Sequence, residues 1–107
     1  MTSTRPIREV VIGNKRWKFV RAIIRERGPK GERILGRCDP PEKKSKAITV
    51  DKRLKGKLEL DTCIHEFTHA PLWDVLSEEF VERFSTDLTN YLWRIGYRKL
   101  PEDECQE

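Results

Sequence analysis

The sequence is poor in residues that cross-link a chain or anchor it in a membrane. Its 107 residues include three cysteines and two histidines, and no two cysteines form a C-x-x-C pair. An odd and scattered set of cysteines argues against a disulfide framework and favours the reducing cytoplasm. No run approaches the roughly 18–20 apolar residues of a membrane span, and the opening MTSTRPIREVVIG lacks the apolar core of a secretory signal. We therefore expect a cytoplasmic protein without a membrane partner.

Neither apolar nor charged residues dominate the composition. Hydrophobic residues contribute 36% and charged residues 37%, which is typical of a small soluble domain and not of a disordered chain. A chain of this length holds one hydrophobic core. We predict a single domain over residues 1–107, with its core at about 7–98 and an acidic tail at 101–107, and we expect a monomer.

The net charge of +4 conceals an asymmetry between the two halves. Residues 1–60 have 18 Lys and Arg against 7 Asp and Glu, whereas residues 61–107 have 4 against 11. Such faces commonly serve only to keep a small protein soluble. The functional alternative is that the basic half binds an anion, such as nucleic acid or an acidic protein, and that the acidic half surrounds a cation.

The first half of the chain favours short strands and the second half favours helices. Alternating side chains over 17–24, an apolar run within 31–39 and β-branched residues at 47–51 predict three or four short, mostly antiparallel strands. A helix follows from about residue 58, where Leu60, Ile64 and Phe67 predict an inward stripe. Pro71 should end this helix. Ser77 is suited to cap a second helix, with apolar positions at Val81, Phe84, Leu88, Leu92 and Ile95 and an end at Gly96.

The only histidines of the chain, His65 and His69, flank Glu66 in the pattern H-E-x-x-H. Positions i and i+4 of a helix stand one above the other, so two imidazoles can bind one zinc ion at about 2.0–2.1 Å each. Zinc lowers the pKa of a water at its open position, and Glu66 as general base accepts the proton during attack on a carbonyl. Because the motif lies in a predicted helix with apolar flanks, we prefer this interpretation to a chance pair of surface histidines.

The stretch IHEFTHA, with a strand and a turn before it and SEEFVERFSTDLTNYLWRIGY after it, resembles known metallopeptidases. It is similar to the small, single-domain zincin-like proteins of phage genomes and, more distantly, to the SprT-like proteases and minigluzincins. The resemblance spans roughly residues 34–98. It implies an α+β, zincin-like fold with a sheet packed against the H-E-x-x-H helix. It also implies zinc as cofactor, a protein or peptide substrate and, for a phage-encoded protein, the cytoplasm of the host cell.

The third metal ligand cannot be a histidine, because the chain has none left. This leaves an acidic residue, and the resemblance to gluzincins implies that it lies on the following helix. At about 100° per residue, Val81, Ser85, Leu88 and Leu92 define the inward face of the second helix. Glu78 lies about 50° from the centre of this face and Glu82 about 90°, whereas Glu79 points away. We expect Glu78 to be the ligand, with Glu82 second and Asp74 a further candidate. The alternative role for Glu78 is compensation of the helix dipole.

Three other residues have candidate roles beside the metal. Asp61 or Asp87 could accept a hydrogen bond from a histidine N–H, although such helix acids are more often only solvated. Cys38, which precedes Asp39-Pro40-Pro41, could approach the metal as an inhibitory thiolate, although structural cysteines are commoner. Cys63 should lie in the core.

These patterns predict a zinc metallopeptidase first and leave two alternatives. One is a nucleic-acid-associated or regulatory protein with a structural zinc site, whose basic half binds phosphates. The other is an inactive, peptidase-like scaffold that binds a protein. The presence of Glu66 favours an active enzyme, because a structural site has no need of a base beside its ligands.

Overall fold

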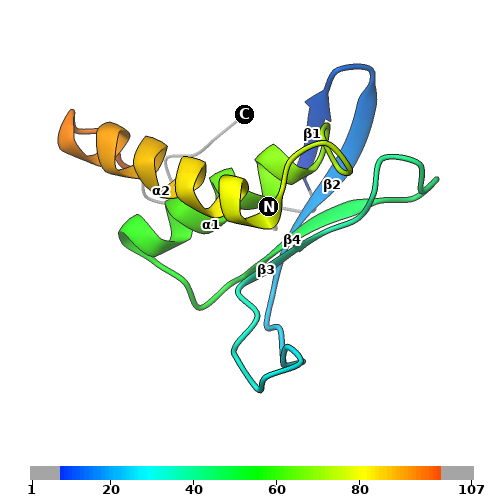
Figure 1. Cartoon of the computed structure of the whole chain (residues 1–107), viewed down its shortest axis with the longest axis horizontal. Helices are drawn as coiled ribbons and strands as arrows, with labels where there is room; N and C mark the ends of the chain where they lie inside the picture. Colours follow the sequence, from blue (N-terminus) through cyan, green and yellow to red (C-terminus); the bar gives the residue numbers. More distant parts are fainter. Residues whose placement is uncertain (1–7, 100–107) are drawn as a thin grey trace, which may run out of the picture.

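The computed structural model describes residues 8–99, which form four strands and two helices (Figure 1). The α+β class, the strand at 47–51 and both helices are as predicted. Residue 7 of the predicted core and the predicted acidic tail at 101–107 lie outside the described residues. In chain order the elements are β1 (Arg8–Ile12), β2 (Lys15–Ala22), β3 (Gly36–Cys38), β4 (Ala47–Asp51), α1 (Gly56–His69) and α2 (Glu78–Arg94).

The sheet is mixed, with the strand order β1-β2-β4-β3. β1 pairs with β2 and β3 with β4 in the antiparallel sense, whereas β4 runs parallel to β2. The prediction of a mostly antiparallel sheet was therefore wrong. Side-chain alternation identifies strands but does not say which strands pair. Here residues 23–46 supply the long connection that a parallel pair requires, so β4 enters between β2 and β3.

The core lies where α1 covers the sheet. Side chains at alternate positions of β4 face the same side, and two of them form the centre of a buried cluster. Trp17 of this cluster donates its indole N–H to the main-chain oxygen of Asp39 at 3.0 Å, which satisfies its one polar group. The buried members are Trp17, Ile48, Val50, Leu54 and Ala70.

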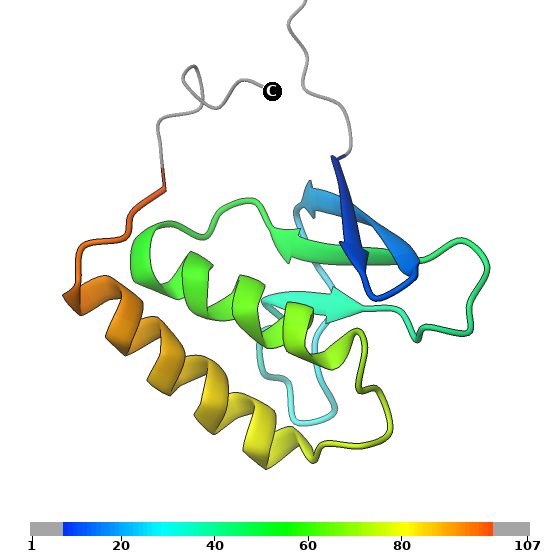
Figure 2. The same cartoon turned by 90° about the horizontal axis from the view of Figure 1, so that it is seen from above.

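The helices form two successive layers on the sheet. α1 packs against β3 and β4, and α2 packs against α1 (Figure 2). Among the described elements α2 contacts no strand, so it buries only a narrow stripe of Val81, Ser85 and Thr89. One face of α1 therefore meets the sheet and another meets α2. Neither helix in the described part of the chain is long and apolar enough to cross a membrane.

Phe67, which the sequence placed on an inward stripe, is exposed, and so are two apolar residues at helical spacing on α2, Phe84 and Ile95. Phe67, Phe84 and Ile95 have exposed fractions of 48%, 41% and 50%. On α1 the buried positions are Thr62 and Glu66, and Phe67 is turned about 100° from Glu66. Within residues 8–99, α1 is the one element that packs on α2, so a wide apolar face of α2 is not covered. Periodicity located the helices but overestimated how much of them is buried.

Local signals set the ends of both helices as predicted. The Ser77 hydroxyl accepts a hydrogen bond from the Phe80 N–H at 3.1 Å and caps α2. Gly96, just beyond α2, has a φ of +102°, a left-handed conformation that glycine adopts without strain. α1 ends at His69, two residues before Pro71. These ends matter for the site, because His69 is the last residue of α1 and Glu78 is the first residue of α2.

Candidate metal centre

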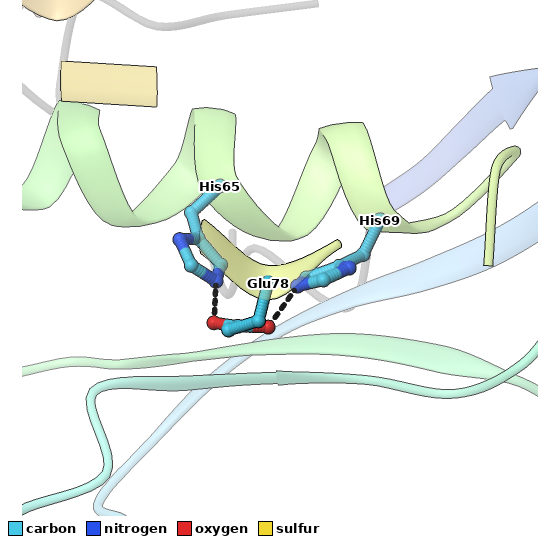
Figure 3. A group of neighbouring side chains, drawn as sticks. All are labelled: His65, His69 and Glu78. Atoms are coloured by element: carbon cyan, nitrogen blue, oxygen red, sulfur yellow. Dashed lines mark hydrogen bonds and ion pairs between the residues drawn. The ribbon is translucent and has the colours of Figure 1, made fainter. Parts of the chain in front are cut away.

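The two histidines lie one turn apart on α1 and share a face. Their ring centroids are 4.9 Å apart, and their side chains are only 19% and 17% exposed. The spacing follows from the helix itself, because residues i and i+4 are neighbours on its surface. This face is the one toward the start of α2, so both Nε2 atoms are directed at the same point (Figure 3).

Glu78, the first residue of α2, brings a carboxylate to that point. Its Oε2 lies 3.0 Å from Nε2 of His65, and its Oε1 lies 2.8 Å from Nε2 of His69 (Figure 3). The short turn at residues 70–77 returns the chain beside α1, and the Ser77 cap sets the direction in which α2 begins. The three residues form the one group in the described chain that could hold a metal ion with three ligands.

The geometry of these donors suits a small metal ion. Their ligand atoms lie within 4.8 Å of one another, and tetrahedral ligands at about 2.0–2.1 Å from zinc are roughly 3.3 Å apart. A shift of a few tenths of an ångström at the exposed Glu78 side chain would lengthen its oxygen-to-Nε2 distances to that spacing. Two imidazoles and one carboxylate suit zinc, among other transition metals, and leave a fourth position open.

The competing ligand candidates are not part of this group. Glu82 lines the same cleft as the histidines, but it does not join the three-residue cluster, and neither do Glu79 and Asp74. Cys38 also lines the cleft. Burial raises the pKa of its thiol to about 12, helped by the charges of Glu66 and Asp39. Its Sγ donates to the Asp39 main-chain oxygen at 3.4 Å, and Cys38 does not join the donor cluster of His65, His69 and Glu78.

Neither acid expected to orient the histidines contacts an imidazole. The Asp61 carboxylate accepts a hydrogen bond from the Thr86 hydroxyl at 3.1 Å and so links α1 to α2. Asp87 is exposed on α2, and within residues 8–99 it makes no hydrogen bond to either imidazole. The packing of His69 against Trp73, with ring centroids 6.1 Å apart, contributes instead to the placement of that ring.

Glu66 lies beside the histidines but points to the sheet side of α1. Its exposed fraction is 7%, and within residues 8–99 its carboxylate has no hydrogen-bond or ion-pair partner. Burial, together with the nearby charge of Glu78, raises the pKa of this carboxyl to about 7. The carboxyl faces the cleft. A largely buried carboxyl without a protein partner is still costly, and such groups are concentrated at sites that use them.

Gly36 is a site residue that the sequence did not single out. A Cβ on Gly36 would lie 2.9 Å from Cγ2 of Thr62 and 3.0 Å from both Cγ and Oε2 of Glu66. The strand β3 can therefore pass directly over Glu66 only because residue 36 has no side chain. The sequence signal was a glycine inside a strand pattern, which often marks a close approach of the backbone.

We expect Gly36→Ala to displace the Glu66 carboxyl without disturbing the metal ligands. A misplacement of about 1 Å at a reacting group can cost roughly 100-fold in rate, so any reaction that uses this carboxyl should slow roughly 10–100-fold. Metal content, measured by elemental analysis beside the native protein, should not change. Full activity in the alanine variant would show that the close contact with Glu66 has no catalytic role.

A cleft of about 860 Å³ joins the metal centre to the edge strand β3. The segment 32–36 forms one wall, and residues of α1 and α2 form the other. The main-chain oxygen of Leu35 accepts from Asp51, and the N–H of Asp39 donates to Ala47. Because these groups alternate along an antiparallel strand, the N–H and C=O of Gly36 and Cys38 point away from β4, at the open edge of the sheet.

Comparison of the chain with protein-family models, with curated proteins and with solved structures finds no match. A function has to be inferred from the chain's own residues.

Proposed function

We propose that this protein is a zinc-dependent peptidase with a zincin-like fold. His65, His69 and Glu78 would hold the metal, and Glu66 would be the general base for hydrolysis of a peptide bond. The observation that carries the proposal is the convergence of three donor atoms (Figure 3) beside the largely buried Glu66 carboxyl, which has no protein partner within residues 8–99. A bound zinc ion would act as a Lewis acid and lower the pKa of water at its open position.

The role of Glu66 follows from its surroundings. Its carboxyl has no ion pair that would have to be broken before it accepts a proton, and it lines the same cleft as the histidines. After accepting a proton it can return that proton to the amine that leaves. A purely structural metal site would place no buried carboxyl here, because an unpartnered one destabilises the fold.

The edge of β3 supports a peptide as the substrate. Outward N–H and C=O groups at Gly36 and Cys38 offer an extended chain the hydrogen bonds of a further strand. Such pairing uses main-chain groups that every peptide has, so it orients a substrate without requiring a particular side chain. The cleft beside this edge, of about 860 Å³, falls within the size range of ligand sites, which is roughly 300–1,000 Å³.

The proposal predicts that hydrolysis depends on one bound metal ion. Purified protein should contain about one equivalent of zinc and cleave casein or a mixed peptide library, because zinc activates the attacking water. A chelator should reduce the rate to background, and added zinc should restore it. His65→Ala, which removes one imidazole, should purify without zinc and without activity. Metal-free native protein, or hydrolysis that survives the chelator, would contradict the proposal.

A further inference from the structure

We propose that four arginines beside the cleft form a subsite for an acidic side chain of the peptide that the cleft binds. This inference deepens the proposed peptidase function and rests on it. Together with Ile24 the arginines line a second pocket, of about 380 Å³, large enough for one carboxylate or phosphoryl group. They are Arg25, Arg27, Arg33 and Arg53, and are called the arginine pocket below.

The backbone holds two of these cations side by side. Arg27 and Arg33 form an isolated antiparallel bridge, closed by a turn in which the Gly28 N–H donates to the Glu32 main-chain oxygen at 2.9 Å. Residues directly opposite in such a bridge present their side chains on the same face, and like charges there are destabilising. An anion bound between the two guanidinium groups would remove this repulsion.

One buried acid neutralises only part of the pocket. Asp51 is fully buried and accepts hydrogen bonds from Nε and Nη2 of Arg53 at 2.9 and 2.7 Å. These bonds hold the pKa of Asp51 well below its usual range, so the carboxylate is ionised. Arg33 lies farther from it, at 3.7 Å. One carboxylate against four arginines leaves an excess of three positive charges.

The other acids near the pocket are engaged elsewhere. Glu26 pairs with Arg37, outside the pocket, at 3.5 Å. Glu32 accepts a hydrogen bond from the Lys30 N–H at 2.9 Å within its own turn. Arg25 has no hydrogen-bond or ion-pair partner within residues 8–99. Arg27 donates from Nη1 to the Gly31 main-chain oxygen at 3.5 Å, which offsets none of its charge. Guanidinium forks match the two oxygens of a carboxylate or phosphoryl group.

Arg33 connects the arginine pocket to the proposed active site, because it lines both cavities. From Arg33 the chain continues along the cleft into β3 and reaches Gly36, the residue over Glu66. At about 3.3 Å per residue, Arg33 is roughly 10 Å from Gly36 along an extended strand. A peptide paired with this edge would therefore bring a side chain two to four residues from the cleaved bond to the arginines. The small pocket suits one such side chain better than a nucleic-acid backbone, which needs a longer groove.

Paired fluorogenic peptides test the subsite. Each pair differs only by Glu against Gln, placed at one of the four positions on either side of the cleaved bond. We expect at one or two positions a kcat/KM about tenfold or more higher for the Glu peptide, and no such preference in Arg27→Gln or Arg33→Gln. Arg83→Gln, on an exposed position of α2 outside both cavities, should keep the preference. Equal rates for every Glu and Gln pair with the native protein would overturn the subsite while leaving the peptidase proposal intact.

A binding measurement separates the two proposals. Calorimetry with the Glu66→Gln protein should show tighter binding of the Glu peptide than of the Gln peptide, and inorganic phosphate should compete with the Glu peptide. The double variant Glu66→Gln/Arg33→Gln should show neither the preference nor the competition. If no peptide is ever hydrolysed but this binding is found, the peptidase proposal fails and the subsite stands.

Duplex DNA binding that Arg27→Gln abolishes, with no preference among peptides, would overturn the subsite in favour of a nucleic-acid surface. Thermal unfolding controls for folding, and Arg27→Gln should not lower the Tm, since it relieves a repulsion.

Discussion

Replacing Glu66 with glutamine is expected to abolish most peptide hydrolysis while the protein keeps its metal. Glutamine has nearly the same shape as glutamate and fits under Gly36, but its amide cannot accept the proton of the attacking water. Loss of a general base typically costs roughly 10²–10⁴-fold in rate. The measurement is kcat with a fluorogenic peptide at neutral pH, alongside zinc content by elemental analysis.

The matched control for this variant is Glu79→Gln, which removes the same charge from an exposed position of α2. It should retain native activity. Equal loss in both variants would point to a general charge effect, and full activity of Glu66→Gln would show that another group accepts the proton.

Glu66→Gln should also be more stable than the native chain at pH 8 when both are metal-free. Burial raises the pKa of Glu66 from 4.5 to about 7. The folded state therefore disfavours the ionised carboxyl, and stability is lost as the pH rises from about 4.5 through about 7. Urea midpoints of the two metal-free proteins should agree at pH 4, whereas at pH 8 the glutamine variant should have the higher midpoint. A stability cost that disappears on removal of the carboxyl would mark Glu66 as a residue kept for function.

Replacing Glu78 with alanine is expected to have the second large effect, the loss of zinc binding. Of the acidic groups in residues 8–99, the Glu78 carboxylate is the one in contact with both imidazoles, at 3.0 and 2.8 Å. Removal of a direct ligand should weaken zinc affinity by more than the roughly 10–100-fold that loss of an outer-sphere partner costs. Competition with a zinc-binding dye measures the affinity, and peptide hydrolysis should fall in parallel at limiting zinc.

Glu82→Ala is the matched control, because Glu82 lines the same cleft on the same helix but lies outside the donor cluster. Its zinc affinity should remain within about twofold of native. The opposite result, with zinc lost from the Glu82 variant and retained by the Glu78 variant, would require α2 to rotate when the metal binds. Such a rotation would contradict the arrangement in Figure 3.

The order of the strands in the sheet could not be predicted from the sequence. Alternating side chains located β2 and β4, but their parallel pairing depends on the path of residues 23–46. The same holds for the contact of Gly36 with Glu66 and for the bridge that joins Arg27 to Arg33. These contacts depend on how strands pair and where the chain crosses the sheet. The alternation of side chains along a single helix or strand does not predict them.

What the sequence determined by itself is local. His65 and His69 share a face because one helical turn separates them, and Ser77 caps α2 because its hydroxyl reaches an N–H three residues away. The tertiary structure decided which acid completes the donor set. Helical phase favoured Glu78, but its contact with both imidazoles also depends on the separation of the helices and on the turn at 70–77. A repeat of 3.6 residues fixes directions around one axis, whereas the distance between two axes is set by the side chains packed between them.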